Sequence, residues 1–125
     1  MLRDRIATLC GRADELAATR PPGDALAEWL RAFLAHARTD HGLAGTVISE
    51  DPEALGPDCH QTILDAAARL VRRAQQAGAV RDDLATGDMV LLIAGIALAT
   101  AHGGTAPERP DRLLALALDA LTARG

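Results

Sequence analysis

Apolar residues recur every three or four positions along most of this sequence, which is the spacing of one buried face of a helix. The chain has no Asn-Gly turn signal, and its Ala- and Leu-rich composition favours helix over sheet. Pro and Gly interrupt the pattern between helices, and a cap signal at 51–53 opens one or two further turns. We therefore predict an all-α fold whose five main helices span residues 2–19, 25–40, 58–77, 89–101 and 111–123.

The stretch from Met89 to Ala101 is the predicted central helix of the domain, because it is apolar on every side except for Thr100. A surface helix should have a polar back, so this one must be enclosed. At about 13 residues it is too short for a bilayer, which needs about 20. We expect its own chain to bury one side and a second subunit to bury the other.

Leucines also surround the last predicted helix almost completely. Two such helices in one small chain indicate a homodimer in which they form a two-fold four-helix bundle. The predicted interface comprises Ala94, Ala97, Leu98, Ala101, Leu113, Leu114, Ala117 and Leu121.

Length and charge narrow the class of protein. The 125 residues fit one domain, and the net charge of −4 argues against direct contact with nucleic acid, which requires a basic face. The sequence shows neither an export leader nor a membrane segment, so we expect a cytoplasmic protein with Cys10 and Cys59 reduced.

The run AGAVRDDLATGDMVLLIAGIALAT, residues 77–100, resembles the C-terminal regulatory domains of TetR/AcrR-type transcriptional regulators. In that family a long helix ends in Gly, a Gly-x-(Val/Ile)-Arg-x-Asp connector follows, and an acidic-capped apolar helix comes next. Gly78, Val80, Arg81 and Asp83 stand in those places. The resemblance extends from about Leu2 to Leu121.

This resemblance implies a helical domain that dimerises through its last two long helices and holds a small-molecule pocket between the others. An N-terminal helix-turn-helix head would bind DNA. Met1 falls where the helix that joins head to body would be, so we expect no DNA-binding domain in these residues. Either the sequence is a piece that lacks the head, its start is assigned late, or it is a naturally headless relative.

Catalysis and metal binding receive little support from the sequence. The nucleophile candidates are Cys10, Ser49 and Cys59; although Cys59 adjoins His60, successive helical side chains point roughly 100° apart. The candidate metal ligands are His36, Asp40, His41, His60 and His102. Single histidines on helices are, however, usually solvated or hydrogen-bonded structural residues. We predict neither an enzyme nor a cofactor or metal.

A pocket for a small hydrophobic effector is the favoured site, since inward stripes of three helices should meet around it. His36 and His60 would orient the effector, with Cys59 at the rim. The bulky side of the 89–101 helix would face this pocket, and its small side, around Ala94, Ala97 and Ala101, would face the partner. The full predicted set is Trp29, Phe33, His36, Cys59, His60, Ile63, Met89, Ile93 and Ile96. The alternative is a headless helical dimerisation or interaction protein with a closed core and no ligand.

Overall fold

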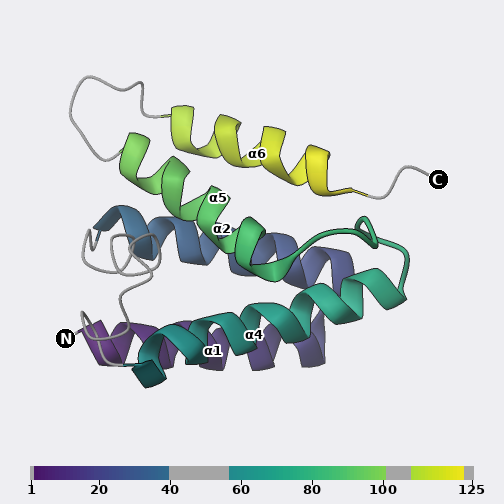
Figure 1. The fold of residues 1–125 in the computed structure, drawn as a ribbon, viewed down its shortest axis with the longest axis horizontal. Coiled ribbons are helices and arrows are strands. Elements are labelled where there is room, and N and C mark those ends of the chain that lie inside the picture. The colour runs from purple at the N-terminus through teal and green to yellow at the C-terminus, as the bar shows by residue number, and fades with distance from the viewer. Residues whose placement is uncertain (1, 40–56, 101–107, 123–125) are drawn as a thin grey trace.

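The computed structural model describes residues 2–39, 57–100 and 108–122, and these residues form five helices. They are α1 (Leu2–Thr19), α2 (Pro22–Thr39), α4 (Pro57–Gln76), α5 (Thr86–Ala99) and α6 (Arg109–Leu121). Figure 1 shows α1 and α4 along one side of the molecule and α6 along the opposite side, with α2 and α5 between them. The predicted all-α fold with five main helices is confirmed.

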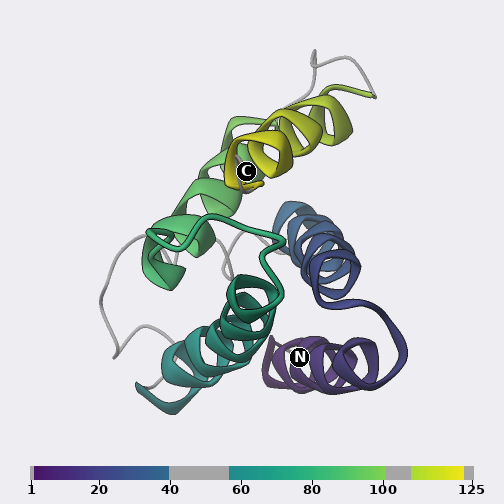
Figure 2. The same cartoon turned by 90° about the vertical axis from the view of Figure 1, so that its right-hand side faces the viewer.

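Helix α2 is the element that the other four share. It contacts α1, α4, α5 and α6, whereas α6 packs mainly on α5 and lies well away from α1 (Figure 2). Helix α5 is less enclosed than its sequence suggests, because Leu91 and Leu92 remain 44% and 45% exposed. The chain therefore buries only one side of its most apolar helix.

Two helix starts differ from the sequence-based expectation. Helix α2 begins at Pro22 and not at Ala25, and the Ala25 amide donates to the Pro21 carbonyl at 2.8 Å. A proline fits the first turn of a helix because the amide that it lacks has no partner there. Helix α5 begins at Thr86 and not at Met89, and Ala85 is its N-cap. The turns predicted at 51–53 lie outside the described residues.

The core is built around the two large aromatic side chains of α2. Trp29 and Phe33 are fully buried, and their ring centroids lie 5.6 Å apart at a tilt of 35°. The Trp29 indole donates a hydrogen bond to the Leu9 carbonyl of α1 at 3.0 Å, which satisfies its buried N–H. Apolar side chains from α1, α4 and α5 enclose this pair.

Gly78 ends α4 in the way that the sequence predicts. Its φ of +72° lies in the left-handed region, where glycine avoids the Cβ clash of other residues. The Gly78 amide donates to the Gln75 carbonyl at 3.0 Å, and the Ala79 amide donates to the Ala74 carbonyl at 2.8 Å. This pair of bonds is a Schellman motif, which satisfies the last carbonyls of the helix.

The connector after Gly78 joins the end of α4 to the end of α6. The Gln75 amide group donates to the carbonyls of Arg81, Asp82 and Leu84 at 3.2–3.3 Å, and the Arg81 amide donates to the Leu121 carbonyl at 2.9 Å. The Arg81 guanidinium forms two 2.9 Å bonds to the Asp83 carboxylate, and these lower the pKa of Asp83. The Gly-x-Val-Arg-x-Asp motif is therefore a turn with its own internal hydrogen bonds.

Alanine substitutions at Gly78 and Gly11 should have opposite effects on stability. Gly78→Ala should lower the free energy of unfolding by about 1–2 kcal/mol, because it forces a Cβ into the left-handed region. Gly11→Ala should raise it by about 0.5–1 kcal/mol, because Gly11 lies inside α1 and a Cβ there meets nothing within 4 Å. Urea denaturation would measure both, and equal effects would contradict the assigned Gly78 conformation.

Candidate functional site

Five of the predicted effector residues lie in the core, on α2, α4 and α5. Each is at most 1% exposed: Trp29, Phe33, Ile63, Met89 and Ile93. His36 and Ile96 lie half-buried, and His36 is three residues before the end of α2. Cys59 and His60 belong to the first turn of α4, but the structure does not describe their side chains.

Two hollows that described residues outline lie elsewhere. One, of about 230 Å³, lies between the start of α2, the connector and the end of α6. Gly23 lines it, and a Cβ on Gly23 would come within 3.0 Å of the Ala79 Cβ, so the helix and the connector approach closely there. Neither this hollow nor the larger one described next includes a residue of the predicted effector set.

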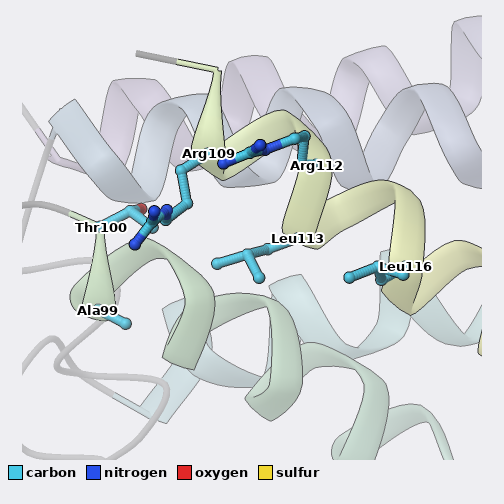
Figure 3. Close-up of a pocket in the computed structure, with 6 residues that line it drawn as sticks. All are labelled: Ala99, Thr100, Arg109, Arg112, Leu113 and Leu116. Atoms are coloured by element: carbon cyan, nitrogen blue, oxygen red, sulfur yellow. The ribbon is translucent and has the colours of Figure 1, made fainter. Parts of the chain in front are cut away.

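The larger hollow, of about 590 Å³, lies where the end of α5 meets the start of α6. Figure 3 shows the α6 residues along one wall and Ala99 and Thr100 along the other. Leucine side chains and two arginines share the α6 wall: Arg109, Arg112, Leu113 and Leu116. This hollow was not predicted from the sequence, although the two arginines near the start of the leucine-rich α6 were a usable signal.

An arginine from α2 caps the C-terminal end of α5 beside this hollow. Arg38 donates from Nε to the Thr100 hydroxyl and from Nη2 to the Thr100 carbonyl, both at 3.0 Å. Thr100 is 2% exposed, and its hydroxyl donates to the Ile96 carbonyl at 2.8 Å. A cation suits this position because the last carbonyls of a helix lack intrahelical partners and carry partial negative charge. This role of Arg38 was not predicted from the sequence, because Arg38 lies 62 residues from Thr100.

The predicted partner-facing side of α5 points into the chain's own core. Ala94 and Ala97 are fully buried, so the prediction that they face a second subunit is wrong. Their small size lets α2 and α4 pack closely against α5, which is why they lie inward. The same correction applies to three residues of α6 that are at most 7% exposed: Leu114, Ala117 and Leu121. Leu98 and Leu113 are half-buried, and Ala101 lies outside the described residues.

The opposite side of α5 and α6 forms an exposed apolar surface, which we call the leucine face. It comprises four exposed residues, Leu91, Leu92, Ala99 and Leu116, together with the half-buried Leu113. Leu116 is 67% exposed, the highest value among the large hydrophobic residues that the structure describes. Gly95 lies on the same side of α5, and a Cβ built on it would meet nothing within 4 Å. The small residue pair Gly95 and Ala99 thus lies outward and not toward the core.

The remaining chemical groups form no reactive centre in the part of the chain that the structure describes. Cys10 is half-buried, its Sγ donates to the Thr62 carbonyl at 3.7 Å, and burial raises the pKa of its thiol, so its nucleophilic thiolate is disfavoured. Within residues 2–39, 57–100 and 108–122, no group of three His, Cys, Asp or Glu is placed to hold a metal ion. None of the described helices combines the length and apolarity needed to cross a bilayer.

Comparisons with known proteins address the family of this chain. A family described as "Transcriptional regulator SbtR-like, C-terminal domain" matches residues 21–123. The crystal structure of a TetR transcriptional regulator from Streptomyces coelicolor superposes on this chain with a TM-score of 0.79. The two sequences are 32% identical, and the match covers 98% of this chain and 71% of the S. coelicolor chain. A comparison with curated protein sequences gave no match. The chain therefore belongs to the SbtR-like C-terminal regulatory domains of TetR-type transcriptional regulators.

Proposed function

We propose that this chain is the effector-sensing and dimerisation domain of its regulator. The observation that carries the dimerisation is the leucine face, where Leu91, Leu92 and Leu116 are 44–67% exposed on adjacent helices. Contiguous exposed apolar surface usually marks an interaction site. A dimeric mass of the chain in sedimentation would support this half of the proposal, and a monomer at micromolar concentration would contradict it.

The effector in this proposal is a small hydrophobic molecule that binds where α2, α4 and α5 meet. Phe33, Ile63 and Ile93 supply apolar surface from the three helices, and His36 supplies a half-buried polar group at the edge. Such a composition is typical of ligand sites, which combine apolar lining with a few orienting polar groups.

A helical dimerisation protein that senses nothing is the second candidate. The observation in its favour is the complete burial of Trp29, Phe33 and Ile93, with the described hollows away from them. In this case the core serves stability alone, and the leucine face retains its role.

Trp29 fluorescence distinguishes the two candidates. Trp29 is the only tryptophan in the sequence, and its ring centroid lies 5.6 Å from that of Phe33. An effector bound between α2, α4 and α5 should therefore shift or quench the Trp29 emission. We expect a saturable change with at least one compound in a panel of hydrophobic acids, phenols and amines. An unchanged emission across the whole panel would favour the second candidate.

His36 should affect the affinity for any compound that the panel identifies. His36→Ala should weaken binding about 3- to 10-fold, which is the effect of losing one hydrogen bond. Arg31→Ala is the matched control, because Arg31 is an exposed cation on the same helix and outside the proposed site. If the two substitutions weakened binding equally, the proposal that the effector contacts His36 would be contradicted.

A further inference from the structure

The larger hollow, where the end of α5 meets the start of α6, has a charged end and an apolar wall. Arg109 and Arg112 are exposed and both line it, and the leucine side chains of Leu113 and Leu116 continue the same wall. Figure 3 shows the Arg109 side chain reaching toward Thr100 and the Arg112 side chain running back toward Arg109. The hollow therefore combines two positive charges at its α5 end with apolar surface along α6.

These two arginines have no acidic partner in the part of the chain that the structure describes. Neither Arg109 nor Arg112 forms an ion pair there. The C-terminal end of α5 carries partial negative charge, but Arg38 already occupies it through two hydrogen bonds to Thr100. The acidic residues at the start of α6 form no ion pair with the arginines either: Glu108 and Asp111. The positive charge that lines the hollow is therefore available to a bound anion.

We propose that the larger hollow is a second ligand site and that it takes a small amphipathic carboxylate. The carboxylate would bind between Arg109 and Arg112, because a guanidinium presents parallel N–H donors that match the two carboxylate oxygens. The apolar tail would cover Leu113 and Leu116, and removing the 67% exposed Leu116 from water favours binding. The volume of about 590 Å³ is typical of small-molecule sites.

This second site is separate from the proposed effector site. None of the predicted effector residues lines the larger hollow. Arg38, which marks its α5 end, lies roughly 13 Å from Trp29 along the axis of α2. A carboxylate bound in the hollow should therefore leave the Trp29 emission unchanged, and His36→Ala should not alter its affinity.

Isothermal titration calorimetry of the 125-residue chain with decanoate tests the proposal. We expect saturable binding of a single decanoate per chain. Decanol has the tail without the charge, and acetate has the charge without the tail, so each should bind at least about tenfold more weakly. Because Leu113 and Leu116 also belong to the leucine face, the titrations are run at a protein concentration at which sedimentation shows a single oligomeric state.

The double variant Arg109→Gln/Arg112→Gln tests the charged end of the site. It should weaken decanoate binding at least about tenfold, the effect of losing hydrogen bonds to a charged group. Arg72→Gln is the matched control, because Arg72 is an exposed arginine on α4, which lies on the opposite side of the molecule from α6 (Figure 1). Circular dichroism of each variant checks that the helices remain folded.

The outcomes separate the second site from the proposed effector site. Weaker decanoate binding in the double variant, with native affinity in Arg72→Gln and His36→Ala, supports the proposal. Native affinity in the double variant would overturn it, and so would decanol that binds as tightly as decanoate. If decanoate changed the Trp29 emission and bound weakly to His36→Ala, it would occupy the effector site. An absence of decanoate binding would overturn the second site and leave the effector proposal to its own test.

Discussion

Trp29→Ala is expected to lower the free energy of unfolding by about 3–5 kcal/mol, the cost of truncating a large buried aromatic residue. Trp29 is fully buried at the junction of α1 and α2 and contacts the Phe33 ring. Domains of this size are stable by only about 5–15 kcal/mol, so the variant should be close to unfolding at 37 °C. Urea denaturation followed by circular dichroism would measure the loss, since the variant has no tryptophan.

Trp29→Phe is the matched control for this prediction. It keeps an aromatic ring but leaves the Leu9 carbonyl without the indole donor, so we expect a smaller loss of about 1–3 kcal/mol. The same loss in both variants would assign the effect to the hydrogen bond and not to packing. A loss below about 1 kcal/mol in Trp29→Ala would contradict the position of Trp29 in the core.

Helices with a clear polar side could be predicted from the sequence, and so could the connector. In α1, α2 and α4 the apolar spacing identifies the buried stripe, and the bounds agree within three residues. Gly78 could be identified because one backbone conformation requires glycine, and the structure has that conformation at φ +72°. In both cases the determining interactions are local in the chain.

The orientation of α5 could not be predicted, because apolar residues surround this helix and their spacing favours no side. Packing decided it: Ala94 and Ala97 allow α2 and α4 to approach, which leaves Leu91 and Leu92 outside. Small residues lie on both sides of α5, so composition alone could not separate the core-facing pair from Gly95 and Ala99. The hydrogen bonds from Arg38 to Thr100 depend on the same long-range packing.

Leu116→Glu is expected to weaken dimerisation at least about 100-fold, the largest effect of any substitution on the leucine face. In the proposed dimer Leu116 is covered by the partner subunit, so the variant would bury a carboxylate in an apolar interface. Removing unpaired charges from water costs several kcal/mol each. Sedimentation equilibrium would measure the dissociation constant.

The same substitution should leave the isolated chain almost unchanged, since Leu116 is 67% exposed. Its free energy of unfolding should shift by no more than about 0.5 kcal/mol, as for most surface changes. Ala7→Glu is the control, because it adds the same charge to an exposed site on α1, which lies away from α6 (Figure 2). If Leu116→Glu retained native dimer affinity, the leucine face would not be the dimer interface. If both variants weakened the dimer equally, net charge and not contact with Leu116 would control association.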